Sequence, residues 1–136
     1  MVKFLSEEWI KYGKNMLEKL DPEKDMKNIT TSLLGVIESV PPSGTTMNFY
    51  FEFQNGKLID FIVNTGDTFK EKEAVFVITG NYGAFKDILK GDMSMAMALL
   101  RNRLKLKGSK MEALKIIKPI DVVIDSLRKI TDEFEE

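Results

Sequence analysis

The sequence predicts a mixed α/β domain, and two kinds of pattern support this fold class. Residues 29–40 are rich in β-branched and aliphatic side chains, and residues 47–54 alternate apolar with polar side chains, as strands do. By contrast, the apolar residues between 120 and 130 recur at the spacing of one helix face. A chain of 136 residues is expected to form one domain, 1–136, and it contains no internal repeat.

The composition argues against several kinds of site. The chain has no cysteine and no histidine, so it lacks a disulfide, a thiol nucleophile, the usual proton shuttle near neutral pH and the commonest metal ligand. Its formal net charge of -1 gives no general attraction to nucleic acid or to an anionic membrane. No apolar run is long enough to span a bilayer, and Glu7 and Glu8 lie where a signal peptide is apolar. We therefore expect a cytoplasmic protein.

The first predicted element is a helix that begins after Ser6, a residue type that caps helix N-termini. The acidic residues Glu7 and Glu8 suit its first turn because of the helix dipole. Its apolar residues at helical spacing are Trp9, Tyr12, Met16, Leu17 and Leu20. The helix is expected to end before Pro22, and residues 23–28 to form a charged loop or a single turn.

Two strands are predicted next, separated by a proline- and glycine-containing break at residues 41–44. The first spans 29–40. In the second, the alternation places a strongly apolar set on one face, namely Met47, Phe49, Phe51 and Phe53.

The turn after the second strand decides how it pairs with the third. A two-residue loop at Asn55-Gly56 would place Phe51 opposite Asp60, whereas a three-residue loop at 54–56 would place Phe51 opposite Ile59. Only the second arrangement joins two apolar faces, and a slip of one residue would separate them. We therefore predict the three-residue loop.

A polar connection at 64–72 leads to the continuous apolar run 74–78, which predicts a central strand covered on both faces. Asn81 is expected to cap the following helix, and Gly91 to end it. Ser94 is a suitable cap for a second short helix.

Asn102 can end that second helix, because asparagine tolerates the left-handed conformation. In the strand 103–107 that follows, the leucines point to one side and three cations, Arg103, Lys105 and Lys107, to the other. These cations could form an anion-binding stripe, but the solvated face of an edge strand is the more common arrangement. Ser109 can cap a further short helix, and Lys118-Pro119 is expected to break the chain before the helix 120–130.

The chain carries none of the common catalytic patterns. The glycines around Asn81 lack the spacing and the lysine of a phosphate-binding loop. No nucleophile elbow or metal-binding pattern is present, and many of the carboxylates lie near the chain ends. The aromatic residues do not alternate with cations as they do in proteins that bind single-stranded nucleic acid. We expect no catalytic residue, no metal, no cofactor and no nucleic-acid partner.

Three segments together resemble the sterol carrier protein family of small lipid-transfer domains, in particular its single-domain prokaryotic members. They are the strand-and-turn phrase 76–82, the aromatic-bearing helix 85–91 and the basic leucine strand 103–108. The chain departs from the family at Ser94-Met95, where Asp-Pro is frequent, and at Asn102, where glycine is usual. The resemblance implies a twisted sheet of about five mostly antiparallel strands, helices over one face and an apolar tunnel between them that binds fatty acids, acyl-CoA esters, sterols or similar lipids.

Ten apolar residues are candidates to line such a tunnel, and four of the eight methionines lie between residues 93 and 111. Methionine is flexible and suits a cavity that adapts to its ligand, although for each candidate taken singly ordinary core is the more common role. The candidates are Phe76, Ile78, Phe85, Ile88, Leu89, Met93, Met97, Leu100, Met111 and Leu114. Lys105 or Lys107 could meet a lipid head group.

The function that we expect is non-catalytic binding or transfer of a lipid or fatty acyl ligand. The alternative is an interaction or scaffold module that keeps the fold and fills the pocket, and an enzyme ranks third because histidine and cysteine are missing. Transient membrane contact and a homodimer are both compatible with the carrier hypothesis.

Overall fold

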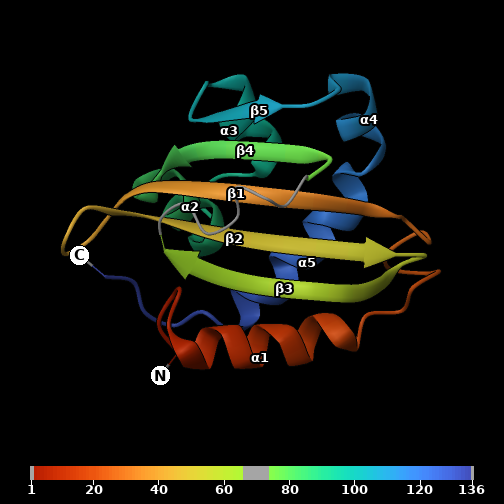
Figure 1. Cartoon of the computed structure of the whole chain (residues 1–136), viewed down its shortest axis with the longest axis horizontal. Helices are drawn as coiled ribbons and strands as arrows, with labels where there is room; N and C mark the ends of the chain where they lie inside the picture. The colour runs from red at the N-terminus through yellow and green to blue at the C-terminus, as the bar shows by residue number, and fades with distance from the viewer. Residues whose placement is uncertain (1, 66–73, 136) are drawn as a thin grey trace.

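Five strands form one open sheet in the computed structural model, which describes residues 2–65 and 74–135 (Figure 1). The strands are β1 (Thr31–Val40), β2 (Thr45–Gln54), β3 (Lys57–Thr65), β4 (Phe76–Asn81) and β5 (Leu104–Lys107). Their order across the sheet is β3-β2-β1-β4-β5. Only the central pair, β1 and β4, is parallel. The mostly antiparallel five-stranded sheet is therefore confirmed.

The helices lie on one side of the sheet and along its β3 edge (Figure 1). They are α1 (Glu7–Glu18), α2 (Tyr82–Lys90), α3 (Met95–Leu100), α4 (Lys110–Lys115) and α5 (Ile117–Ile130). α2 packs on β1 and β4, α1 packs on β3 and α5, and α3 packs beside β5. The other face of the sheet carries no helix among the described residues.

The predicted helix caps are present. The side chains of Ser6, Asn81, Ser94 and Ser109 each accept a hydrogen bond from a backbone N–H three residues later, at 2.9 to 3.2 Å. Gly91 ends α2 with a φ of 86°, and Asn102, which follows α3, has a φ of 59°. These bonds satisfy backbone donors that would otherwise have no partner in the first turn.

The prediction of a three-residue loop between β2 and β3 is wrong. Gln54 pairs directly with Lys57, so the loop has two residues, Asn55 and Gly56. Both have a positive φ, 49° and 81°, as the tight hairpin turn that matches strand twist requires.

A β-bulge further along the hairpin restores the alignment that the tight turn would have lost. After Phe53 pairs with Leu58, the register shifts by one residue, and Phe51 pairs with Phe61. Ile59 is the extra residue of the bulge and is exposed, whereas Phe51 and Phe61 are both buried. The apolar faces of β2 and β3 therefore meet without a longer loop.

Two further predictions need correction. The apolar run 74–78 is not buried on both faces, since Phe76 and Ile78 are buried while Val77 is half-buried and Val75 is exposed. Its strand lies between β1 and the short edge strand β5.

Pro119 does not break the chain, because α5 begins at Ile117 and includes Pro119 in its first turn. Proline is tolerated there, since a first-turn N–H has no helical acceptor. The polar connection predicted at 64–72 lies outside the described residues except for the last two positions of β3.

Aromatic side chains make up much of the core between sheet and helices. Phe51 stacks on Phe61 with ring centroids 4.8 Å apart, and Trp9 of α1 meets Phe61 edge-on at 5.7 Å. Trp9 Nε1 also donates a hydrogen bond to Thr131 Oγ1 at 2.8 Å, which ties α1 to the end of α5. The buried indole therefore keeps a polar partner while its ring fills the core.

The two ends of the described chain are joined to each other. Lys3 and Glu133 form a parallel β-bridge, and Phe4 N donates to the Glu133 carbonyl oxygen at 2.9 Å. Lys3 Nζ donates to Glu135 Oε2 at 2.8 Å, and this hydrogen bond raises the pKa of Lys3. Because the N-terminal segment folds back in this way, Phe4 reaches the core.

Candidate functional site

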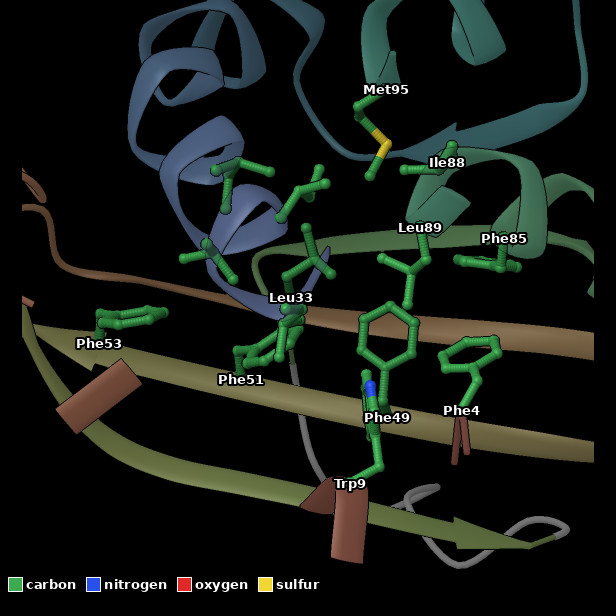
Figure 2. Close-up of a pocket in the computed structure, with 14 residues that line it drawn as sticks. Phe4, Trp9, Leu33, Phe49, Phe51, Phe53, Phe85, Ile88, Leu89 and Met95 are labelled. Atoms are coloured by element: carbon green, nitrogen blue, oxygen red, sulfur yellow. The ribbon is translucent and has the colours of Figure 1, made fainter. Parts of the chain in front are cut away.

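An apolar cavity of about 50 Å³ lies between the inner face of the sheet and helices α2 and α5 (Figure 2). We call it the inner cavity. Every one of its lining residues is aliphatic, aromatic or methionine. They are Phe4, Trp9, Leu33, Phe49, Phe51, Phe53, Phe85, Ile88, Leu89, Met95, Ile120, Val123, Ile124 and Leu127.

The floor of the inner cavity depends on a glycine. Gly35 of β1 pairs with Phe49 of β2, and a Cβ added at Gly35 would overlap the Phe49 ring. The ring therefore lies across β1, with its centroid 5.7 Å from that of Phe85 in α2 and an interplanar angle of 86°. Aromatic packing over a strand glycine of this kind fills the space that a side chain would otherwise occupy.

A second apolar space, the junction pocket, continues from the inner cavity toward β4 and β5. Its volume is about 30 Å³. It shares Leu33, Met95 and Ile120 with the inner cavity. Because α3 contributes Met95 to both spaces, the position of this helix affects the passage between them.

A much larger depression of about 600 Å³, the outer groove, lies between α3, β5 and α4. Four residues, Leu99, Leu106, Ala113 and Ile117, line both the outer groove and the junction pocket. The three spaces are therefore adjacent in series, from the molecular surface to the centre of the core. The inner two are narrow, and the expected open tunnel is not confirmed.

The structure distributes the ten residues predicted to line a tunnel over these spaces. Phe85, Ile88 and Leu89 line the inner cavity; Phe76 and Ile78 line the junction pocket; Leu100 and Leu114 line the outer groove. Met93, Met97 and Met111 line none of the three. Met97 has 39% of its surface exposed, and Met111 is more exposed still.

Sequence reasoning missed several lining residues. Ile120, Val123, Ile124 and Leu127 were recognisable as the apolar stripe of the last helix, and Phe49, Phe51 and Phe53 as the apolar face of a strand. The sequence does not indicate that the apolar stripe of this helix packs against the apolar face of this strand. Phe4 had no usable signal, because its position depends on contacts with residues near the other end of the chain.

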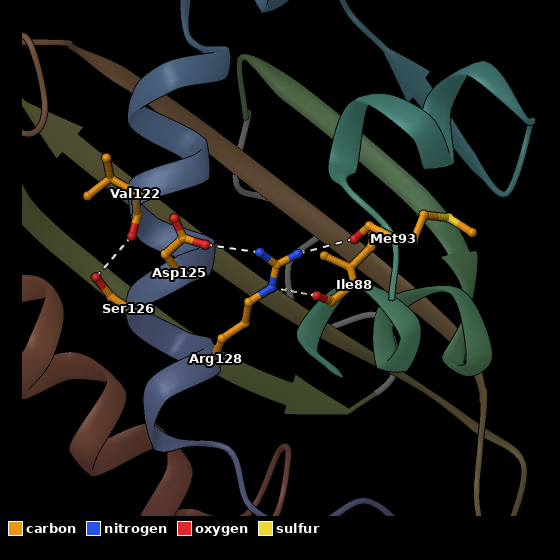
Figure 3. Close-up of polar contacts among 6 residues, drawn as sticks. All are labelled: Ile88, Met93, Val122, Asp125, Ser126 and Arg128. Carbon is orange, nitrogen blue, oxygen red and sulfur yellow. Dashed lines mark hydrogen bonds and ion pairs between the residues drawn. The ribbon is translucent and has the colours of Figure 1, made fainter. Parts of the chain in front are cut away.

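Arg128 fixes the wall of the inner cavity opposite the sheet (Figure 3). Its Nε donates to the carbonyl oxygen of Ile88 at 2.8 Å, and one terminal nitrogen donates to the carbonyl oxygen of Met93 at 3.1 Å. The other terminal nitrogen binds Asp125 Oδ1 at 2.9 Å. One guanidinium thus links α5 to the end of α2 and to the segment that leads into α3.

Charged groups stay outside the inner cavity. The pKa of Asp121 on α5 is raised, mainly by burial and secondarily by repulsion from Asp125, while Arg128 acts in the opposite direction. The described part of the chain holds no group of three or more acidic side chains placed to bind a metal ion. Within residues 2–65 and 74–135, no helix combines the length and the apolar character needed to cross a membrane.

Most of the chain matches a known family. Residues 14–121 match the model of the SCP-2 sterol transfer family. The chain belongs to this family. Membership in the SCP-2 family supports lipid or sterol binding or transfer in general, by a carrier domain that is generally non-catalytic. A comparison with curated proteins found no match.

Solved structures of SCP-2 proteins share the fold. A crystal structure of sterol carrier protein 2 has 20% sequence identity and a TM-score of 0.78, covering 95% of this chain and 100% of that chain. A protein of Thermus thermophilus, described as possibly a sterol carrier protein, has 19% identity and a TM-score of 0.76, covering 97% and 92%. The palmitated SCP2L2 of Aedes aegypti has 18% identity and a TM-score of 0.58, covering 88% and 95%.

Proposed function

We propose that this SCP-2 family member binds a single-chain lipid, such as a fatty acid or an acyl ester, and carries it without chemical change. The hydrocarbon tail passes through the outer groove and the junction pocket into the inner cavity. The proposed contacts are Leu100 and Leu114 at the surface, Phe76 and Ile78 in the middle, and Phe85, Ile88 and Leu89 at the inner end.

The serial arrangement of the three spaces, the inner two of which are lined by apolar side chains, carries this proposal. Neighbouring spaces share lining residues, so a chain-like ligand meets apolar surface along the whole route. Burial supplies the binding energy, since each methylene removed from water contributes about 0.8 kcal/mol. About ten buried methylenes would supply about 8 kcal/mol, the scale of micromolar affinity before ordering costs are subtracted. The description of the Aedes aegypti neighbour as palmitated also favours a fatty acyl ligand.

The inner cavity must widen to receive a tail. Its volume of about 50 Å³ is about a third of the roughly 150 Å³ in which an engineered cavity of another protein holds benzene. Two features favour widening. Met95, which stands between the inner cavity and the junction pocket, has a flexible side chain. Helix α4, which forms one wall of the outer groove, has no buried residue, so displacing it exposes little apolar surface.

Native mass spectrometry of gently purified protein, followed by lipid extraction, tests the carrier proposal directly. We expect a co-purifying lipid, or saturable uptake of a fluorescent fatty acid by the empty protein. Protein that neither carries lipid nor takes up the probe would contradict the proposal.

A matched pair of substitutions tests the route. Met95→Trp should fill the passage between the inner cavity and the junction pocket and weaken fatty-acid uptake at least about tenfold. Met97→Trp, two residues away on a partly exposed side chain that lines none of the three spaces, should leave uptake unchanged. Overpacking by the new indole costs about 1 to 3 kcal/mol, so folding is checked by thermal unfolding of both variants. Met95→Ala, which opens the passage, should retain uptake; equal uptake by all three variants would contradict the route.

The small inner cavity favours a second candidate function, an interaction module with a filled core. Such a protein would contain no lipid, would displace no fluorescent fatty acid and would form a stable complex. Size-exclusion chromatography with light scattering, performed on the same sample as the lipid extraction, separates this candidate from the carrier.

A further inference from the structure

The basic residues of the chain are unevenly distributed. The whole sequence has 20 lysines and arginines against 21 acidic residues, but residues 101–118 contain seven basic residues and a single acid, Glu112. This segment runs through β5 and α4 to the first turn of α5. The rest of the molecule is therefore net acidic, and the positive charge is concentrated on the side of the molecule that bears the outer groove.

Most of these cations are available to a partner. Within the described residues, two of the seven form ion pairs: Arg103 with Asp87 at 3.1 Å, and Lys115 with Glu112 at 3.2 Å. The others are exposed, and no ion pair is formed by them in the described part of the chain. They are Arg101, Lys105, Lys107, Lys110 and Lys118.

Large apolar side chains stand among these cations. Leu100, Met111 and Leu114 have 77%, 73% and 71% of their surfaces exposed, more than any other large apolar side chain that the structure describes. Leu100 comes from α3 and the other two from α4, where they are one turn apart. Leu100 and Leu114 line the outer groove together with Lys105 and Lys110. We call these three apolar residues and the cations of 101–118 the basic rim.

We propose that the basic rim docks onto the surface of an anionic phospholipid bilayer. Leucine and methionine side chains would insert among the acyl chains, while the lysines beside them meet lipid phosphates, as in other proteins that bind membrane surfaces through apolar and basic groups together. This inference rests on the proposed function, because docking here would place the outer groove directly against the membrane that supplies or receives the lipid.

Charge argues for a bilayer rather than a second copy of the chain as the occupant. A symmetric dimer through the basic rim would bring the same positively charged surface of each copy face to face. Like charges across an interface are unfavourable, whereas an anionic bilayer is complementary to the whole rim. The rim also lies away from α1, at the opposite edge of the sheet (Figure 1).

The test measures sedimentation of the 136-residue chain with vesicles of phosphatidylcholine alone and of equal parts phosphatidylcholine and phosphatidylglycerol. We expect binding to the anionic vesicles only, and weaker binding when salt is raised from about 0.1 M to about 1 M. Replacing Lys105, Lys107 and Lys110 together by Gln should weaken binding about fivefold for each lysine. The matched control replaces Lys11, Lys14 and Lys19, exposed on or just after α1, by Gln, and should bind as the unaltered protein does.

A second pair of variants tests the apolar part of the rim. Leu100→Ser with Leu114→Ser should weaken anionic-vesicle binding at least about tenfold, whereas Ile59→Ser with Val75→Ser, which alters two exposed side chains elsewhere, should not. Circular dichroism establishes that all variants fold. Equal binding to neutral and anionic vesicles, equal loss in the α1 control, or a stable dimer that Leu100→Ser dissociates would overturn the proposal.

Uptake of a fluorescent fatty acid from solution, measured on the lysine variants, separates this inference from the carrier proposal. Normal uptake without vesicle binding would overturn only membrane docking at the rim. Vesicle binding without uptake would leave the docking surface in place and overturn the carrier function.

Discussion

Arg128 Nε on α5 and the Ile88 carbonyl oxygen on α2 are 2.8 Å apart and form a hydrogen bond (Figure 3). The same guanidinium donates to the Met93 carbonyl oxygen, so it holds together the three segments that close the inner cavity on the side away from the sheet. A planar guanidinium can reach two carbonyl groups at once, whereas a lysine ammonium on its flexible stem cannot hold the same geometry.

We therefore expect Arg128→Ala to lower the free energy of unfolding by about 1 to 3 kcal/mol, through the loss of charged hydrogen bonds to two backbone carbonyls. Urea denaturation measures this change. Arg128→Lys should be intermediate, and the exposed neighbour substitution Lys129→Ala should change stability by no more than about 0.5 kcal/mol. Equal effects at positions 128 and 129 would show that the bridge contributes nothing.

Gly35→Ala is expected to destabilise the protein by about 1 to 3 kcal/mol, because its new methyl group overlaps the Phe49 ring. Phe49→Leu in the same chain removes the ring, so the double variant should be more stable than the sum of the two single changes predicts. Chemical denaturation of the four proteins gives this coupling energy, which we expect to exceed about 0.5 kcal/mol. Strict additivity would mean that Phe49 is not what excludes a side chain at position 35.

Asp121 supplies a prediction about pH. Its pKa in the folded protein is raised above the ordinary value of 3.8, first by partial burial of the carboxylate and second by repulsion from Asp125, although the residue as a whole is exposed. The folded state then keeps the proton to a higher pH than the unfolded state does, so this group lowers stability as pH rises through the interval above 3.8.

Asp121→Asn should consequently stabilise the protein at neutral pH, by less than about 0.5 kcal/mol because the side chain is exposed and screened by water. The gain should disappear once the pH falls below the ordinary value, where both states are protonated. Thermal unfolding across this pH range measures it, and a gain that is the same at every pH would rule out the electrostatic origin.

The local elements of this fold were predictable because each has a short-range chemical signal. Ser6, Asn81, Ser94 and Ser109 accept backbone N–H groups within three residues, and the alternation of β2 identifies its buried face. The predicted length of the hairpin loop was wrong because the apolar faces of β2 and β3 can be aligned in two ways, by a longer loop or by a bulge at Ile59. The alternation of apolar and polar residues predicts which faces meet, but it does not distinguish the longer loop from the bulge.

The candidate site was less predictable than the elements that form it. Phe85, Ile88 and Leu89 do line the inner cavity, since the buried face of a short amphipathic helix can be read from its spacing. Met97 and Met111 do not line any of the three spaces, because a methionine on a two-turn helix can face either inward or outward. Met95 lines both the inner cavity and the junction pocket, yet its inward direction depends on how α3 packs against β5.

The bridge between Lys3 and Glu133 brings the two ends of the described chain side by side, on the part of the molecule remote from α3 and α4 (Figure 1). A tether attached at either end would therefore orient the molecule in the same way, with the basic rim directed away from the support. Protein immobilised on a sensor chip through an N-terminal or a C-terminal tag should capture anionic vesicles equally well.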